Sequence, residues 1–163
     1  MKIVEIHKDN RVDKFFTAHW GADFIVSEGE RLHGHDLDGF AVADEKEIFC
    51  LLTYHLKNGE CEIVTLNSLM TNQGIGTDLI SKMIEKARGI SGLKRLWLMT
   101  TNDNLDAIRF YQKRGFLLSA IYPNAIQKSR DLGQDIPAIG CYGIPIRDEI
   151  EMEYPIDLIL NPK

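Results

Sequence analysis

Hydrophobic residues recur along the chain with a period of two in some stretches and of about 3.6 in others, which predicts alternating strands and helices. Residues 2–7 alternate and predict a short strand. Residues 12–20 place apolar side chains on one helix face, so we expect a helix with Asn10 as its N-cap and Gly21 as its stop. Glycines interrupt the stretch 23–39, where we expect a loop with one helical turn.

Three strand-like runs follow in the middle of the chain. Asn58-Gly59, between the second and third runs, is a strong hairpin signal because both residues adopt positive φ readily. The pattern therefore predicts an antiparallel meander. Its expected strands are Phe40–Ala43, Ile48–Leu56 and Cys61–Leu66.

The chain then returns to helical spacing. An amphipathic helix is expected from Ile75 to Ile90, and a short apolar strand from Leu93 to Met99. A further helix is expected from Asp103 to Arg114, with Asp103 able to cap its start and Gly115 supplying a left-handed stop.

The last part of the chain predicts two more strands. In the final one the even positions face the core, apart from Asp148, while Glu149, Glu151 and Glu153 face solvent. The expected elements are a strand Phe116–Tyr122, a helical turn near Ala125–Asp131 and the final strand Ile146–Tyr154.

This order of elements predicts one domain over residues 1–163. A strand, a helix, an antiparallel meander, a helix, a strand, a helix and two closing strands form a mixed α/β (α+β) fold, in which helices flank a mostly antiparallel central sheet. A chain of 163 residues is also the usual size of one domain.

Composition and charge exclude several classes of protein. The net charge of −5 does not favour nucleic acid, and no apolar run approaches the ~18 residues that span a bilayer. Charges within residues 1–8 are unlike a signal peptide, so we expect a cytoplasmic protein. The widely spaced Cys50, Cys61 and Cys141 are expected to be buried thiols, and we expect no metal site. The sequence leaves a homodimer open.

A glycine turn, Gln73-Gly74-Ile75-Gly76-Thr77, joins the meander to the helix that follows. Free N–H groups at the start of a helix, together with the positive end of its dipole, form an anion site, and glycines let a phosphate approach the backbone. The turn is neither a nucleoside-triphosphate loop nor a dinucleotide fingerprint, because it lacks Gly-Lys-Ser/Thr and a third glycine. From these residues alone, a tight turn without a ligand remains open.

A second motif lies about 30 residues downstream: Asn104-x-x-Ala107-x-x-Phe110-Tyr111-x-x-x-Gly115-Phe116. Paired with the glycine turn, it resembles the Gcn5-related N-acetyltransferase (GNAT) family over nearly the whole chain. The resemblance implies that the turn holds the pyrophosphate of acetyl-CoA, the cosubstrate. It also implies that the fourth and fifth strands splay apart and that the second motif lines the thiol end. Thr71 departs from the family's Gln or Arg, which puts the cofactor affinity in doubt.

The resemblance also assigns roles to individual residues. Tyr111 would donate a proton to the departing thiolate, and Glu62 would act as a base through water; a core aromatic and a solvated strand residue are the alternatives. His19 and Trp20 would shape the acceptor site or simply pack in the core. The residues expected to bind the cofactor are Leu66, Asn67, Ser68, Gln73, Gly74, Ile75, Gly76, Thr77, Asn104, Ala107 and Phe110.

The expected function is transfer of an acetyl group to a primary amine by direct attack on the thioester. The long segment Pro123–Pro145 could close over the acceptor, which favours a small molecule. A protein or peptide N-acetyltransferase and a non-catalytic acyl-CoA-binding domain are the alternatives. Retention of Tyr111 and of a candidate base argues against the non-catalytic reading.

Overall fold

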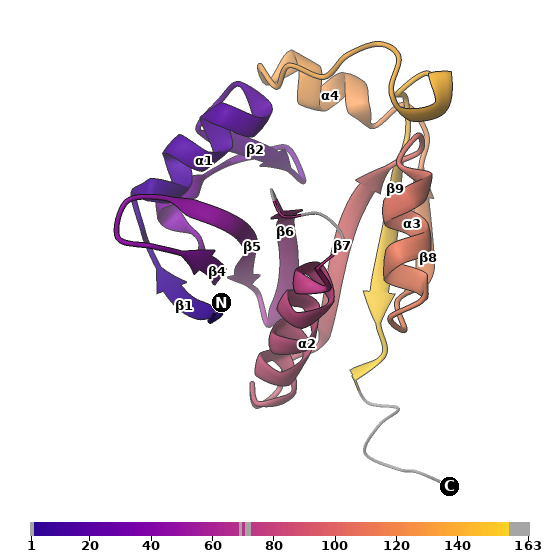
Figure 1. Ribbon diagram of the computed structural model, residues 1–163. Helices are drawn as coiled ribbons and strands as arrows, with labels where there is room; N and C mark the ends of the chain where they lie inside the picture. The colour runs from indigo at the N-terminus through magenta and orange to yellow at the C-terminus, as the bar shows by residue number, and fades with distance from the viewer. Residues whose placement is uncertain (1, 69, 71–72, 157–163) are drawn as a thin grey trace, which may run out of the picture.

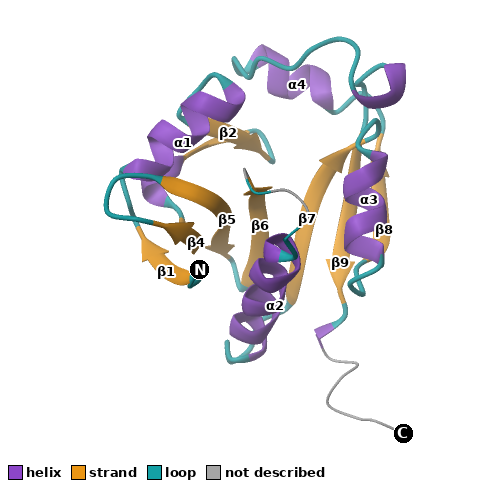
Figure 2. Ribbon diagram, viewed as in Figure 1, coloured by secondary structure: helices purple, strands orange, loops and turns teal. Residues whose placement is uncertain are grey.

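The computed structural model of the protein describes residues 2–68, 70 and 73–156. Within these residues a seven-stranded sheet with the order β1-β4-β5-β6-β7-β9-β8 is flanked by helices, and β2 and β3 form a separate hairpin (Figures 1 and 2). The predicted fold class is confirmed. The strands are β1 Val4–His7, β2 Phe24–Ser27, β3 Glu30–His33, β4 Asp38–Ala43, β5 Ile48–Lys57, β6 Glu60–Ser68, β7 Arg95–Thr101, β8 Leu117–Tyr122 and β9 Glu149–Tyr154. The helices are α1 Arg11–Trp20, α2 Ile75–Arg88, α3 Leu105–Gln112 and α4 Ile126–Asp131, with 3-10 turns η1 Gly34–Asp36 and η2 Cys141–Gly143.

Helices cover both faces of the sheet, so alternate side chains of the central strands enter two separate cores. On one face α2 buries Leu79 and Met83 against Leu52 of β5. On the other face α1 buries Val12 and Phe16 against Leu51 and its neighbours. On both faces of the sheet, the apolar positions of the strands and helices, which recur every two and about every 3.6 residues, are buried against each other.

β6 and β7 run parallel and separate at one end of the sheet. Their pairing extends from Glu60↔Arg95 to Ile63↔Leu98. Beyond this point the two strands diverge toward their carboxyl ends, as Figure 1 shows. The pairing of β6 with β5 skips Val64, a β-bulge that bends the strand and increases its twist. The splay that the family resemblance implied is therefore present, and a bulge lies at the residue where it begins.

The prediction for residues 23–39 was wrong in part. A 3-10 turn is present at Gly34–Asp36, but most of the predicted loop is the hairpin of β2 and β3. Its turn is formed by Glu28 and Gly29, which both have positive φ. Glu-Gly is a weak hairpin signal compared with Asn-Gly or Asp-Gly, and four-residue strands give little periodicity to detect.

One of the two predicted helix caps was wrong. Asn10 is the N-cap residue of α1 as predicted, but its side chain makes no capping hydrogen bond; Asp9 instead accepts a hydrogen bond from the backbone N–H of Arg11 at 2.8 Å. At α3, Asn104 caps the helix by accepting from the N–H of Ala107 at 3.2 Å. The carboxylate next to it, Asp103, is buried and has other partners.

The final strand is shorter and more buried than expected, beginning at Glu149 rather than Ile146. Glu151, predicted to face solvent, is buried with 6% exposure. It accepts hydrogen bonds from Ser119 at 2.7 Å and Tyr122 at 3.3 Å, and it pairs with Arg95 at 3.2 Å. A periodic pattern cannot reveal a buried glutamate whose partners come from other strands.

Of the three cysteines, Cys50 and Cys61 are buried as predicted, whereas Cys141 is exposed in η2. A loop position carries no hydrophobic period that could have indicated its exposure. None of the helices in the described residues is long and apolar enough to cross a bilayer.

Candidate active site

The splay of β6 and β7 opens a cleft of ≈450 Å³ that reaches from the sheet to α3. Leu66 and Asn67 of β6 line one side, and Asn104, Ala107 and Tyr111 line the other. Because β6 has lost its β7 partner here, backbone groups on that edge face the cleft rather than a neighbouring strand. The cleft thus offers hydrogen-bonding backbone along one wall and an aromatic hydroxyl on the other.

The glycine turn lies at the start of α2, beside the splayed strands. Gly74 has φ +74°, a left-handed conformation that a residue with a Cβ adopts only at a cost, and it immediately precedes the first residue of α2. Gln73 and Gly74 are exposed, and Ile75 to Thr77 are partly exposed. The first N–H groups of a 14-residue helix are therefore open to an anion.

An arginine just beyond the end of α3 supports the turn. Arg114 donates hydrogen bonds to the Thr77 hydroxyl at 3.0 Å from Nε and 2.5 Å from Nη2, and its guanidinium lies 3.5 Å from the centre of the Phe110 ring. The same ring is 3.4 Å from the position that a Cβ on Gly76 would occupy. Residues of both sequence motifs therefore meet here, and Phe110 separates the turn from the rest of α3.

Tyr111 lies in the wall of the cleft and is surrounded by aromatic rings. Phe110 and Phe116 pack edge-on against it, with ring centres 5.3 and 5.5 Å away. Burial raises the pKa of the Tyr111 phenol well above its ordinary value. The hydroxyl therefore stays protonated at neutral pH.

Ser68, the last residue of β6 and a predicted cofactor-binding residue, forms its contacts within the protein. Its hydroxyl lies 3.0 Å from the sulfur of Cys50 and accepts from the backbone N–H of Met70 at 3.1 Å. Thr71, which stands where the GNAT family has Gln or Arg, lies outside the described residues.

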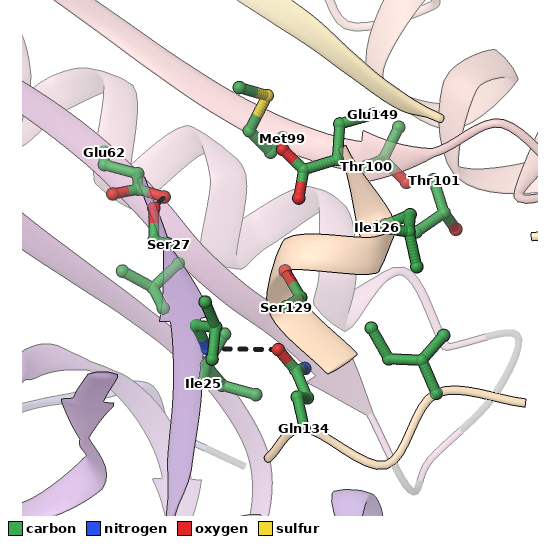
Figure 3. A pocket seen from close by; sticks show the side chains of 13 residues that line it. Ile25, Ser27, Glu62, Met99, Thr100, Thr101, Ile126, Ser129, Gln134 and Glu149 are labelled. Carbon is green, nitrogen blue, oxygen red and sulfur yellow. Dashed lines mark hydrogen bonds between the residues drawn. The ribbon is translucent and has the colours of Figure 1, made fainter. Parts of the chain in front are cut away.

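A second cavity of ≈130 Å³ adjoins the cleft (Figure 3). Both are lined by Ile25, Val64, Met99, Thr100, Thr101 and Gln134, so they share a wall. Glu62 projects into the smaller cavity from β6, with only 7% of its surface exposed. Ser27 donates a hydrogen bond to its Oε1 at 2.5 Å. Burial nevertheless raises the pKa of Glu62 to about 7, so the protonated and ionised forms of the carboxyl are both populated near neutral pH.

A second carboxylate, Glu149 of β9, faces the same cavity (Figure 3). Burial raises the pKa of Glu149 as well. The alternation of the last strand placed this residue on the solvent side, so it was not among the predicted site residues. Ser27, Ser129 and Gln134 could not be predicted either, since loops and short strands offer no pattern from which to find them.

The structure separates the two residues predicted to shape the acceptor site. Trp20 lines the cleft. His19 lines a different groove on the outer side of α1, where its ring stacks on Phe15 at 4.1 Å and its Nδ1 lies 2.8 Å from the Phe15 carbonyl. Among the described residues, no group of three or more His, Cys, Asp or Glu side chains is arranged to hold a metal ion.

Residues 123–145, here called the roof segment, cover the smaller cavity. Figure 1 shows α4 lying across the end of the sheet between α1 and α3. Gln134 accepts a hydrogen bond from the backbone N–H of Val26 at 3.1 Å (dashed in Figure 3), and Arg31 donates to the Leu132 carbonyl at 2.7 and 2.9 Å. The roof segment is thus fastened to the β2–β3 hairpin.

Comparison with known proteins agrees with this geometry. The family described as Acetyltransferase (GNAT) family matches residues 5–116, which contain both sequence motifs. The chain belongs to the GNAT acetyltransferase family. Two Bacillus subtilis relatives resemble this GNAT protein along most of its length. The uncharacterized protein YdhI is 43% identical over 154 residues, covering 94% of this chain and 95% of that protein. The uncharacterized protein YxbD is 39% identical over 140 residues, covering 85% and 87%.

Solved GNAT structures share the fold at low sequence identity. The IAA acetyltransferase from Bacillus cereus superposes with a TM-score of 0.72 at 20% identity, covering 94% of this chain and 97% of that one. A GNAT family acetyltransferase from Elizabethkingia anophelis, solved with acetyl-CoA bound, gives a TM-score of 0.61 at 24% identity over 72% and 75%. The ribosomal-protein-S18-alanine N-acetyltransferase from Escherichia coli gives 0.61 at 17% identity over 95% and 94%.

Proposed function

We propose that the protein is an acetyl-CoA-dependent N-acetyltransferase of the cytoplasm that acetylates a primary amine on a small molecule. The observation that carries the proposal is the pair of adjoining cavities. One contains a buried tyrosine between splayed strands, and the other contains a buried carboxylate. An acyl donor in the first cavity and an amine in the second would meet at their shared wall.

The residues of the glycine turn and of the larger cleft fit acetyl-CoA, which supplies an acetyl thioester. The open N–H groups of Ile75 and the following residues suit the pyrophosphate, and the free edge of β6 at Leu66 and Asn67 suits the amide groups of the pantetheine arm. Backbone N–H groups on that edge would also stabilise the oxyanion that forms at the carbonyl, an effect often worth about 3–4 kcal/mol.

Two side chains would handle the protons. Glu62 accepts the proton of the ammonium group, because its raised pKa leaves it a competent base near pH 7. The freed amine attacks the carbonyl carbon and forms a tetrahedral intermediate whose nitrogen is positively charged. As the carbon–sulfur bond breaks, Tyr111 gives its proton to the thiolate, and the nitrogen loses its second proton, which returns to the Tyr111 phenolate through solvent. The first ammonium proton, held by Glu62, is released to solvent, so one proton is produced in each turnover.

The roof segment favours a small acceptor over a folded protein. It lies over the cavity that holds Glu62 and is hydrogen-bonded to the hairpin on its far side. An extended peptide would need an open groove at this point. The cavity of ≈130 Å³ instead suits a compact amine.

The proposal is tested by thiol release from acetyl-CoA across a panel of small amines, amino acids and peptides, with the product identified by mass spectrometry. We expect acceptor-dependent release and a mass gain of one acetyl group on a small amine. Release that depends on peptides alone would favour a peptide N-acetyltransferase. No release with any acceptor, together with tight binding of acetyl-CoA, would favour a non-catalytic acyl-CoA-binding domain.

Gly76→Val should weaken CoA binding by about tenfold or more. A Cβ at Gly76 already lies 3.4 Å from Phe110, so the two methyl groups of valine would displace the ring and the Arg114 that covers it. Titration calorimetry with CoA measures the change. Gly89→Ala is the matched control at the other end of α2, where φ is −79° and the backbone accepts alanine. Unchanged CoA affinity in Gly76→Val would contradict the assignment of the turn.

A further inference from the structure

The smaller cavity contains twice the negative charge that the proposed chemistry needs. Glu62 enters from β6 and Glu149 from β9, on opposite sides of β7. Glu62 pairs with Trp97 of β7, and Glu149 pairs with Thr101 of the same strand. Their pairing partners are four residues apart, which corresponds to roughly 13 Å along β7. Both side chains nevertheless point into one cavity, as Figure 3 shows.

Neither carboxylate has a cationic partner among the described residues. The only hydrogen bond to Glu62 comes from Ser27, and no hydrogen bond or ion pair to the Glu149 carboxylate is formed within the described chain. Among the described residues, no Lys, Arg or His lines the cavity. Glu151, buried to the same degree as Glu62 and on the same strand as Glu149, is fully paired by Arg95, Ser119 and Tyr122.

This contrast indicates a ligand. A carboxylate taken out of water without a cation is costly, and the pairing of Glu151 with Arg95 offsets that cost. Glu62 has only the hydrogen bond from Ser27, and Glu149, which is partly buried, has no partner within the described residues. The side chain of Glu62 is more than nine-tenths buried and aimed into a cavity that shares a wall with the cleft for the acyl donor. The missing positive charges would therefore arrive with the acceptor.

We infer that the acceptor is a small dication, a diamine with an apolar body, in which Glu62 faces the reacting amine and Glu149 binds the second ammonium group. The walls between the two carboxylates match such a molecule. Val64, Met99, Ile126 and Ile136 are apolar and would contact a hydrocarbon linker. A monoamine would leave the partly buried Glu149 without a cation, which lowers the affinity of the monoamine.

This inference rests on the proposed function, and its test compares two matched acceptors. Putrescine carries two ammonium groups; its amino-alcohol analogue replaces one of them by a hydroxyl of similar size. We expect wild type to prefer putrescine in kcat/KM by about 10- to 100-fold, the usual worth of a hydrogen bond to a charged group. Glu149→Gln should reduce this ratio toward one by raising KM for putrescine much more than it raises KM for the amino alcohol. Glu149→Asp should keep part of the preference.

Glu153→Gln is the control for the loss of charge. It makes the same change on the same strand, but Glu153 does not line the cavity, so the preference for putrescine should persist. Equal kcat/KM for the two acceptors in wild type would overturn the inference. An equal loss for both acceptors in Glu149→Gln would also overturn it, because a structural or general-base role would not discriminate between them.

Binding separates a failure of the inference from a failure of the proposed function. Calorimetry with the CoA-saturated protein should show tighter binding of putrescine than of the amino alcohol in wild type and equal binding in Glu149→Gln. If monoamines are acetylated but putrescine and the amino alcohol bind equally tightly to wild type, the acetyltransferase proposal stands and a dication as the preferred acceptor is excluded. Binding of the dication without thiol release would exclude the catalytic proposal alone.

Discussion

Replacing Glu62 by glutamine should lower kcat/KM by about 10²- to 10⁴-fold, the range expected for loss of a general base. Glutamine keeps the shape and can still accept the hydrogen bond of Ser27, so the cavity should be preserved. In wild type kcat/KM should rise with pH and level off above pH 7, because burial raises the pKa of Glu62 to about 7 and only the ionised form is a base. Steady-state thiol release from pH 5 to 9 measures both effects.

The same variant should gain stability in alkaline solution. With its pKa raised from 4.5 to about 7, Glu62 binds a proton more tightly in the folded than in the unfolded state. Its stabilising contribution is therefore complete below about pH 4.5 and is lost as the pH rises through 7. Above pH 7 the ionised group costs about 3 kcal/mol of unfolding free energy, which glutamine avoids. Urea unfolding at pH 5 and pH 8 should show a gain that is largest at pH 8.

Two results would contradict the role of Glu62. A Glu62→Gln enzyme with the wild-type pH profile would place the base elsewhere, with Glu149 the first alternative in the same cavity. A stability difference that does not change between pH 5 and pH 8 would contradict the raised pKa of Glu62. Loss of the hydrogen bond from Ser27 alone would lower stability at both pH values equally.

Tyr111→Phe should reduce kcat by about 10²- to 10³-fold while CoA binding stays within about twofold, the pattern of a group that acts as an acid during the reaction. The ring contacts with Phe110 and Phe116 involve carbon atoms that phenylalanine retains, so the wall of the cleft should keep its shape. Single-turnover thiol release measures the chemical step, and calorimetry measures CoA affinity.

Tyr154→Phe is the matched control for this change. Tyr154 also packs against Phe116, with ring centres 5.4 Å apart, but its hydroxyl accepts a hydrogen bond from Arg88 outside the cleft. It should keep wild-type kcat. If Tyr111→Phe and Tyr154→Phe behave alike, the hydroxyl of Tyr111 has no part in proton transfer and its ring is a packing element.

Much of this fold could be predicted because its long elements have strong local patterns. α2 carries an unbroken helical period, and the turn at Asn58-Gly59 sets the β5–β6 pairing through local backbone preferences. The β2–β3 hairpin was missed because its strands are four residues long and its order comes from contacts distant in sequence. Among these are the hydrogen bonds from Val26 to Gln134 and from Arg31 to Leu132.

The candidate site divides in the same way. The glycine turn and the motif from Asn104 to Tyr111 are each contiguous in the sequence, so both could be recognised before the structure placed Asn104 and Tyr111 in the cleft. The smaller cavity, which we propose for the acceptor, is lined by residues of β2, β6, β7, β9 and the roof segment, and no local pattern joins these elements. Glu149 illustrates the difference, because alternation along β9 could not distinguish solvent from an enclosed cavity. Side chains that contact an acceptor need not follow the hydrophobic period of the strand or helix on which they lie.

The fastening of the roof segment has an evolutionary consequence. At both anchors described, one partner is a main-chain group: the carbonyl of Leu132 and the N–H of Val26. Substitutions at Ile126, Ser129 or Ile136, which face the cavity, would leave the Leu132 carbonyl anchor intact. We therefore expect the lining of the smaller cavity, and with it the acceptor preference that we propose, to tolerate change at these roof positions while the roof segment stays fastened to the hairpin.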